Sequence, residues 1–361
     1  MRPTATPEQE ELRFAVRDFC AREVTPDRLQ TWETTADGAD PALRAAVAAL
    51  GWLGLGAPVS AGGSGASLTD VALLVAECAR GLVPRSVLGV IRGVVVLASV
   101  APGSAVLPEL LAGRKRLAIA FDEEGARRPE SFETKIESTP TGDVVRGAKA
   151  YVPDAKAAEF HLVAGQGPDG AALVLVDAGA GHVRLQELKT FGGDRQAHVD
   201  YDGATVREAL GGGAALFLRV QRTQEALALA EMVGGMEAVL DATVDYAKER
   251  EQFGQKIALF QAVRHQLADM SIRLSASRHL AWRAITRVDA GKLEGHEVES
   301  ALAYVGRSFR ELCVGGHHIH GGAGFVVEHP LRFHSERAQS LAVRYAPEAP
   351  ALEAVARALL D

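Results

Sequence analysis

Apolar residues recur at helical spacing in the first third of the chain, from about residue 7 to 112. The segments EELRFAVRDFCAREV, PALRAAVAALGWLGL and LTDVALLVAECARGL carry this pattern, and the turn-rich stretch PVSAGGSGAS separates the last two. From about residue 115 to 210 the pattern changes to short β-rich runs such as RLAIAF, EFHLVAG and AALVLVD, separated by Gly, Pro and Asp. The pattern therefore predicts a helical region followed by a compact β domain.

Long helical patterns return from about residue 215 onward. The apolar positions there form two stripes, Leu229, Val233, Met236, Leu240, Val244 and Ala247, then Ile257, Phe260, Val263, Leu267, Met270 and Leu274. Such stripes predict two neighbouring antiparallel helices of a bundle, joined by the segment REQFG at residues 250–254. We therefore expect three domains: a helical one over residues 1–113, a β domain over 114–212 and a helical bundle over 213–361.

The composition fits a globular chain, because 47% of the 361 residues are hydrophobic and 24% are charged. The formal net charge of −7 opposes a general attraction to nucleic acid or to an anionic membrane. No apolar run approaches the length of a membrane span, and the N-terminus lacks the apolar centre of a signal peptide. The three cysteines lie far apart without a CxxC spacing, so we expect no disulfide framework, no zinc site and a cytoplasmic location.

The segment REQFG raises a specific question about the connection between the two long helices. A simple helix stop explains Gly254, which can take the left-handed conformation, and Arg250, whose charge suits the last turn of a helix. It leaves Phe253 and the nearby Gln261 without an explanation.

Five segments together resemble the acyl-CoA dehydrogenase family, flavoenzymes that desaturate acyl-CoA thioesters. They are TPEQEELRFAVRDF, LGWLGLGAPVSAGGSG, GAKAYVPDAKAAEFHLVA, YAKEREQFGQKIALFQ and HIHGGAGFVVEHP, and they span nearly the whole chain. The resemblance implies an α+β fold: an N-terminal helical domain, a small middle β domain and a C-terminal four-helix bundle. It also implies FAD as the cofactor, an acyl-CoA substrate, an electron-acceptor flavoprotein or similar, and a homo- or hetero-oligomer (dimer or tetramer).

In such enzymes the REQFG connection forms part of a cradle for FAD that is bound mainly to a neighbouring subunit. The resemblance implies that Arg250 clamps the pyrophosphate, because a guanidinium makes paired, charge-assisted hydrogen bonds to phosphate. Phe253 and Ile257 would line the cofactor with apolar surface, and Gln261 would offer an amide. The alternative is a capped helix end with Phe253 in the core.

The segment HGGAGF supplies the other half of this cradle. Gly321 and Gly322 would let the backbone approach a nucleotide closely, and His318 stands where the family usually has Gln. The neighbouring histidines also suggest a metal site as a rival reading. We expect no metal, because adjacent histidines on a helix point in different directions and no HExxH-type spacing occurs.

The β domain departs from the family where the cofactor ring and substrate are usually held. FDEEGARRPES stands in place of the family's TEP…GSD stretch, so Asp122, Glu123 and Glu124 fall there and GSD is absent. In YVPDA, Tyr151 takes the aromatic position and Pro153 the place of a Thr that normally bonds the flavin, although Pro has no N–H or hydroxyl to donate. The alternative is a divergent loop that still binds flavin through other main-chain groups.

The catalytic base is the second departure, since the family places a Glu at one of two positions. The late position falls on Tyr345 and the early one on Gln224, neither of which is an acid. Glu225 and Glu348 are the nearest carboxylates, but one residue turns a helical side chain by about 100 degrees. Glu225 is our candidate base, and a solvated residue at the start of a helix is the interpretation we favour over it.

Three hypotheses follow. The chain is a self-sufficient FAD-dependent acyl-CoA dehydrogenase with an unusual base, or a catalytically incomplete partner subunit of a heteromeric enzyme that contributes to the FAD site of a companion chain. The segment EHP after HGGAGF is similar to bacterial paired-subunit enzymes that act on bulky or steroid acyl-CoA esters. The third, a helical scaffold without flavin, is disfavoured because REQFG and HGGAGF have no packing role that needs their chemistry.

Overall fold

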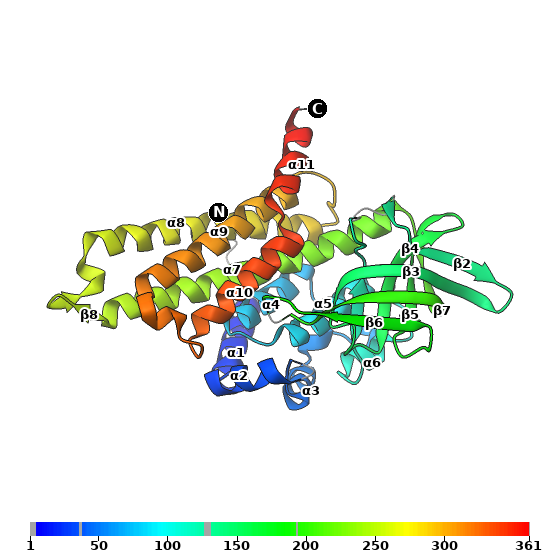
Figure 1. Cartoon of the computed structure of the whole chain (residues 1–361), viewed down its shortest axis with the longest axis horizontal. Coiled ribbons are helices and arrows are strands. Elements are labelled where there is room, and N and C mark those ends of the chain that lie inside the picture. Colours follow the sequence, from blue (N-terminus) through cyan, green and yellow to red (C-terminus); the bar gives the residue numbers. More distant parts are fainter. Residues whose placement is uncertain (1–4, 36–37, 126–130, 193, 361) are drawn as a thin grey trace. The chain divides into compact units, whose positions relative to one another are not determined.

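The computed structural model describes all residues except 1–4, 36–37, 126–130, 193 and 361. The helices are labelled in Figure 1, with the bounds α1 (Pro7–Glu23), α2 (Pro26–Thr34), α3 (Pro41–Ala49), α4 (Leu68–Arg80), α5 (Arg85–Val100), α6 (Leu107–Leu111), α7 (Ala214–Glu249), α8 (Gln261–Asp289), α9 (Glu297–His320), α10 (Pro330–Tyr345) and α11 (Glu348–Leu360). The predicted order of a helical region, a β domain and a helical region is confirmed.

The strands lie between α6 and α7, apart from one short hairpin. Their bounds are β1 (Leu117–Ala120), β2 (Lys135–Thr139), β3 (Gly142–Pro153), β4 (Phe160–Gly167), β5 (Gly170–Asp177), β6 (Val183–Leu188) and β7 (Gln196–Gly212). The hairpin between α7 and α8 consists of β8 (Glu251–Gln252) and β9 (Gln255–Lys256).

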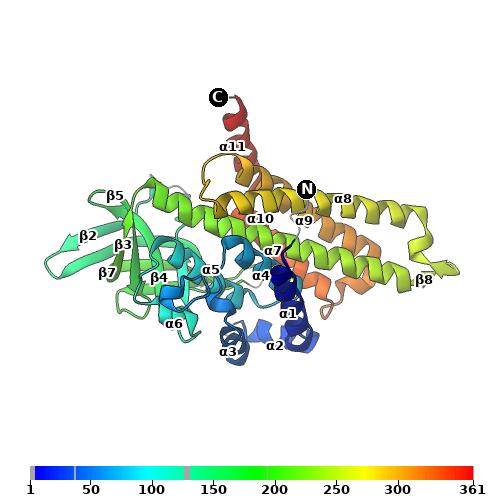
Figure 2. The ribbon, with the colours of Figure 1, turned by 180° about the vertical axis from the view of Figure 1, so that it is seen from behind.

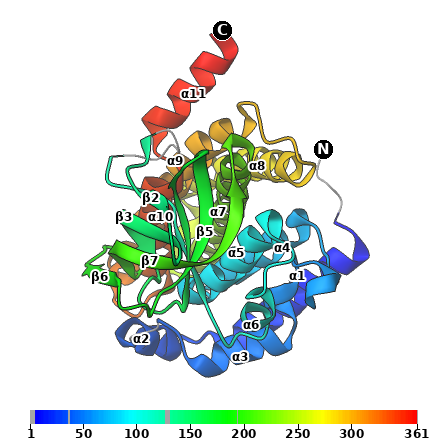
Figure 3. The ribbon, with the colours of Figure 1, turned by 90° about the vertical axis from the view of Figure 1, so that its right-hand side faces the viewer.

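The seven strands β1–β7 form one sheet that curls back on itself. The strand order is β1-β4-β2-β3-β7-β5, with β6 paired to β7, and Figure 3 shows β3, β7 and β5 as neighbours. Because β5 also pairs with β4, strands β4, β2, β3, β7 and β5 make a closed ring. A closed ring leaves few unpaired strand edges at which a strand of another chain could pair.

Successive residues of the central strands enter two different cores. On β4, Leu162 belongs to the cluster that includes Phe121, whereas Val163 belongs to the cluster around Tyr201. On β5, Leu175 and Val176 divide in the same way. Both faces of these strands are therefore buried, which explains why their sequences read as continuous apolar runs.

The contacts divide the chain into two compact units, and each unit is discontinuous in sequence. The first, which we call the helical unit, contains residues 1–31, 67–83 and 225–361. The second, which we call the β unit because it contains the seven-stranded sheet, contains residues 32–66 and 84–224. The three predicted domains stay a prediction, because the first of them is divided between the two units.

Within the first unit, α7 and α8 run side by side to the β8–β9 hairpin (Figure 2). The Arg278 guanidinium of α8 donates two hydrogen bonds, of 2.9 and 2.6 Å, to the Glu237 carboxylate of α7. Because the two helices lie side by side and the chain reverses direction between them in the hairpin, they are antiparallel, as predicted.

Close backbone approach fixes the packing of α4 in this unit. A Cβ on Gly234 of α7 would lie 1.9 Å from the carbonyl oxygen of Ala76 in α4, so only glycine fits there. The carboxylate of Asp289, the last residue of α8, accepts hydrogen bonds from the backbone N–H groups of Leu68 and Thr69. These contacts satisfy donors at the start of α4 that have no partner within the helix.

Among the described residues, no helix combines the length and the apolar character that crossing a bilayer requires.

Candidate functional site

The REQFG segment forms a tight hairpin at the end of α7, and not a plain helix stop. Arg250 is exposed, and its backbone carbonyl accepts a 2.9 Å hydrogen bond from the N–H of Ile257, which ties the two sides of the hairpin together. Within the described part of the chain, the Arg250 guanidinium has no hydrogen bond or ion pair. The hairpin therefore presents an uncommitted cation to solvent.

Phe253 stands at the tip of the hairpin and is 93% exposed. Its backbone φ is +53°, a left-handed value that side chains larger than glycine rarely adopt, and Gly254 beside it has φ +78°. The ring makes an edge contact with Phe260 at 6.2 Å between centroids. The alternative that Phe253 lies in the core is wrong. A strained, exposed aromatic residue indicates a position shaped for a contact outside this chain.

The two other predicted residues of this segment follow the hairpin directly. Ile257 begins the short 3-10 turn η4 (Ile257–Leu259) and is half-buried. Gln261 is the first residue of α8 and is exposed. Arg250, Phe253 and Gln261 are thus grouped on one short connection, with their side chains available to a ligand.

The HGGAGF segment forms a turn at the end of α9. Gly321 has φ +58° and ψ −139°, and the 3-10 turn η5 (Gly321–Phe325) follows. A Cβ added at Gly321 or Gly322 would meet nothing within 4 Å, so the backbone is open to solvent at both positions. The conformation of Gly321 requires glycine, and the open backbone fits the close approach of a nucleotide.

Tyr246 connects the two segments. Its ring stacks on the imidazole of His320, with centroids 4.3 Å apart and an angle of 16° between the planes. The Tyr246 hydroxyl also donates a 3.3 Å hydrogen bond to the His320 carbonyl. The REQFG hairpin and the glycine turn are therefore held at the same end of the helical unit. Sequence reasoning missed Tyr246, although the aromatic residue four positions before Arg250 was a visible signal.

The histidines of this region make different side-chain contacts, although the rings of His320 and His329 meet edge-on at 4.9 Å between centroids. His318 lies 3.3 Å from the amide nitrogen of Gln266, and His317 lies 2.7 Å from the hydroxyl of Ser335. Burial, with the nearby charges of His329 and His317, lowers the pKa of His320 to about 4. No group of three or more potential metal ligands occurs among the residues that the structure describes.

In the β unit, the segment that replaces TEP…GSD contains a buried ion pair. Lys149 is fully buried, and its ammonium lies 2.6 Å from the Glu123 carboxylate, which also accepts hydrogen bonds from the N–H groups of Glu133 and Thr134. Burial opposes ionisation, but the hydrogen bonds from Lys149 and from the backbone lower the pKa of Glu123. Glu123 is therefore a structural anchor. Residues 126–130 of this segment lie outside the described residues.

Lys149 also contacts Phe132, whose ring centroid is 3.9 Å from the ammonium. Sequence analysis did not single out Lys149, because one lysine in a strand usually points to solvent.

Tyr151 occupies an irregular part of β3. Its φ is +56°, its side chain is 43% exposed, and the pairing register with β7 shifts between Lys149 and Val152. The Tyr151 ring lies 5.3 Å from that of His198. Pro153 is half-buried at the end of β3, opposite Gln196. The bulge turns an aromatic face outward, which is the position that the sequence resemblance assigned to a flavin contact.

The two family positions for the catalytic base contain no acid, and the nearby carboxylates differ in burial. Gln224 and Glu225 are 7% and 8% exposed, well inside α7. The interpretation of Glu225 as a solvated residue at a helix start is wrong, because the helix begins at Ala214. Tyr345 ends α10, and Glu348 pairs with Arg307 at 3.4 Å.

Comparison with known proteins agrees with this architecture. The N-terminal domain model of acyl-CoA dehydrogenase matches residues 6–113, and the C-terminal domain model matches residues 212–359. The fold and these matches define an oxidoreductase that acts on CH–CH bonds. The chain belongs to the acyl-CoA dehydrogenase family.

Several relatives cover nearly the whole chain. The acyl-CoA dehydrogenase IpdE2 of Mycolicibacterium smegmatis is 26% identical over 94% of this chain and 95% of its own length. The CarC subunit of the caffeyl-CoA reductase-Etf complex of Acetobacterium woodii is 26% identical over 89% of each chain. A solved variant of the Tcur3481-Tcur3483 steroid ACAD has a TM-score of 0.90 and 27% identity, with 98% of each chain covered.

Proposed function

We propose that this chain is one subunit of a heteromeric, FAD-dependent acyl-CoA dehydrogenase and that it contributes its REQFG hairpin and glycine turn to an FAD shared with a companion chain. The observation that carries the proposal is the exposure of Phe253 together with the uncommitted guanidinium of Arg250. An apolar ring and an uncommitted cation on one strained hairpin suit an isoalloxazine- and phosphate-containing ligand.

The residues of this surface fit FAD in their chemistry. Arg250 would bind the pyrophosphate, Phe253 and Ile257 would contact apolar parts of the cofactor, and Gln261 and His318 would donate or accept directional hydrogen bonds. The open backbone at Gly321 and Gly322 leaves room for the nucleotide. When bound, FAD supplies the acceptor for the hydride that leaves the β-carbon of the acyl thioester.

The ring-binding half of the site is weaker in this chain. Pro153 has no donor for the flavin, and Glu123 is committed to Lys149. Tyr345 and Gln224 stand at the base positions, so removal of the α-proton would depend on a carboxylate of the companion chain. Two solved relatives, the Tcur3481-Tcur3483 steroid ACAD and the ChsE4-ChsE5 complex of Mycobacterium tuberculosis, are described as pairs of chains. The description of the first as a steroid ACAD supports a bulky, steroid-like acyl-CoA as the substrate class.

A second candidate is a self-sufficient dehydrogenase in which Glu225 is the base. The burial of Glu225 in α7 favours it, because a carboxylate held away from solvent is a better general base than a solvated one. An electron-transferring flavoprotein would reoxidise the cofactor in either case.

The test compares the chain alone with the chain purified together with the product of its neighbouring gene. We expect the chain alone to retain little flavin and to turn over acyl-CoA poorly with an artificial electron acceptor, and we expect the complex to show a flavin spectrum and activity. Removal of a general base typically costs a factor of about 10²–10⁴, which sets the scale for any homomeric activity. Turnover by the chain alone at ordinary enzyme rates, abolished by Glu225→Gln, would instead establish the self-sufficient enzyme.

A further inference from the structure

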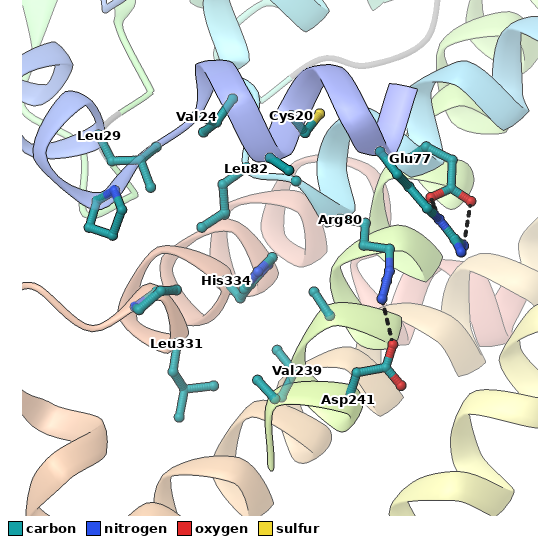
Figure 4. A pocket seen from close by; sticks show the side chains of 17 residues that line it. Cys20, Val24, Leu29, Glu77, Arg80, Leu82, Val239, Asp241, Leu331 and His334 are labelled. Carbon is teal, nitrogen blue, oxygen red and sulfur yellow. Dashed lines mark hydrogen bonds and ion pairs between the residues drawn. The ribbon is translucent and has the colours of Figure 1, made fainter. Parts of the chain in front are cut away.

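An open cavity of about 480 Å³ lies in the helical unit between α1, α2, α4, α7 and α10 (Figure 4). Its walls are largely apolar, with Val24, Leu29, Leu82, Val239 and Leu331 among the lining residues. A space of this size falls within the range of small-molecule sites, which are typically about 300–1,000 Å³. Its lining residues are separate from the hairpin and the glycine turn.

Two polar atoms in the cavity wall have no partner. His334 of α10 is 4% exposed, and its Nδ1 has no hydrogen bond within the described residues. The Nε of Arg80 in α4 is likewise buried and unpartnered, although the terminal nitrogen of the same guanidinium lies 2.7 Å from Asp241. Figure 4 shows His334 and Arg80 entering the same cavity from different helices. A buried polar group without a hydrogen bond costs desolvation free energy. A ligand oxygen that bonded to these nitrogens would remove this cost.

The charges around the cavity are already compensated. Glu77 accepts hydrogen bonds from Arg13 and Arg17, and Asp241 pairs with Arg80. Burial and the two neighbouring cations, Arg337 and Arg80, lower the pKa of His334 to about 3, so its imidazole is neutral. A neutral imidazole can donate or accept one hydrogen bond without changing this balance. The cavity therefore suits an uncharged ligand better than an ion.

The cavity is also distinct from the catalytic region of the proposed function. Val239 lies fourteen residues after Glu225 on α7, which corresponds to roughly 21 Å along a helix that rises about 1.5 Å per residue. Between these positions, α7 contacts α4 at Gly234 and Ala76, where the backbones touch. A molecule in the cavity would therefore not reach the base positions.

We propose that this cavity binds a small uncharged amphiphile, with an apolar ring or chain body and one hydroxyl or ketone oxygen that bonds to Arg80 Nε and the imidazole of His334. The apolar walls would desolvate the body of the ligand, and the two unpartnered nitrogens would orient its oxygen. This site is additional to the acyl-CoA site and does not depend on the proposed subunit arrangement.

The test uses 1-naphthol as the probe and two matched ligands. Naphthalene lacks the oxygen, and 1-naphthoate carries a negative charge. We expect calorimetry or quenching of naphthol fluorescence to show one 1-naphthol per full-length chain, and 1-naphthoate to bind more weakly. His334→Phe should weaken 1-naphthol roughly three- to tenfold and leave naphthalene unchanged. His279→Phe, at an exposed position of α8, is the matched control and should change neither.

A second variant keeps the test decisive if His334→Phe folds poorly. Ala242→Trp, at an exposed α7 position that lines the cavity, should fill the space and abolish binding of 1-naphthol and naphthalene together. Binding must also persist under saturating butanoyl-CoA. The proposal fails if no 1-naphthol binds, if Ala242→Trp binds it normally, if acyl-CoA displaces it, or if 1-naphthoate binds more tightly.

Discussion

The ring of Tyr246 stacks on the imidazole of His320, and this contact joins the end of α7 to the end of α9. Tyr246 lies four residues before REQFG, and His320 is the first residue of HGGAGF, so the stack sets how far the hairpin lies from the glycine turn. His320 has no hydrogen bond on either ring nitrogen within the described residues, so this stack and an edge contact with the ring of His329, at 4.9 Å between centroids, hold its orientation. We therefore regard Tyr246 as a positioning residue.

Tyr246→Ala should lower FAD affinity without removing any group that contacts the cofactor. An aromatic pair contributes about 0.5–1.5 kcal/mol beyond its buried area, so we expect a loss of roughly two- to tenfold in affinity. Tyr246→Phe keeps the stack and should behave nearly as the natural chain does. Flavin titration of the apo-complex measures both, with Tyr304→Ala on α9 as the control. Equal effects of Tyr246→Phe and Tyr246→Ala would assign the role to the hydroxyl.

Arg250→Ala should remove the proposed pyrophosphate contact. The loss of a charge-assisted hydrogen-bonded contact costs about 1.5–3 kcal/mol, so the dissociation constant for FAD should rise by roughly 10- to 150-fold. Arg250→Lys should recover part of the affinity, because an ammonium keeps the charge and loses the planar fork. Lys248→Ala, which also removes an exposed cation near the hairpin, is the matched control. Unchanged flavin retention in Arg250→Ala would place the clamp elsewhere.

Lys149→Met should destabilise the β unit by about 3–5 kcal/mol, because it leaves the Glu123 carboxylate buried without its cation. The double variant Lys149→Met with Glu123→Gln should recover a substantial part of this loss, since no uncompensated charge remains. Urea unfolding of the two single variants and the double variant gives the coupling free energy directly. Additive losses would mean that the two side chains act independently.

Asp154 predicts a pH dependence of stability in the same unit. Burial raises the pKa of Asp154 to about 6, against the lowering influence of Arg85, Arg195 and Arg116 and together with the repulsion of Asp194. Because the folded-state pKa lies above the ordinary value of 3.8, the ionised form is disfavoured on folding. Stability is therefore lost as pH rises from about 4 to 6 and is level above that.

Asp154→Asn removes this ionisation and keeps a side chain that tolerates the positive φ of +53° at this position. We expect the variant to be more stable than the natural chain by about 3 kcal/mol at most at pH 8 and nearly equal to it at pH 4. Denaturant midpoints measured from pH 4 to 8 test this. A stability difference that grew toward low pH would contradict the sign.

The helical spacing of apolar residues was enough to predict α7 and α8, since Leu229 and Met236 are fully buried. It did not predict how strongly each stripe is buried, because Val263 and Leu267 near the hairpin are only half-buried. Periodicity gives the face of a helix that avoids water, but it does not say whether the same chain or another chain covers that face.

For the candidate site too, the sequence predicted some features and not others. REQFG and HGGAGF could be identified as ligand segments from their residue types, whereas the left-handed backbone of Phe253 could not, since this conformation is uncommon for a bulky residue. The burial of Glu225 was mispredicted because the start of α7 at Ala214 places that residue three turns inside the helix. The Lys149–Glu123 pair depends on a contact between residues from different strands and loops, which local patterns do not contain.

The discontinuity of the helical unit affects how the protein is made. Helices α1 and α4 leave the ribosome early, but residues 225–361, which complete their unit, are synthesised after the whole of the segment 84–224. During that interval α1 and α4 can pack on each other but not on α7 or α8, while the second unit can already close its sheet. We therefore expect nascent chains truncated before α7 to bind chaperones through their N-terminal helices, and release of these helices to require residues 225–361.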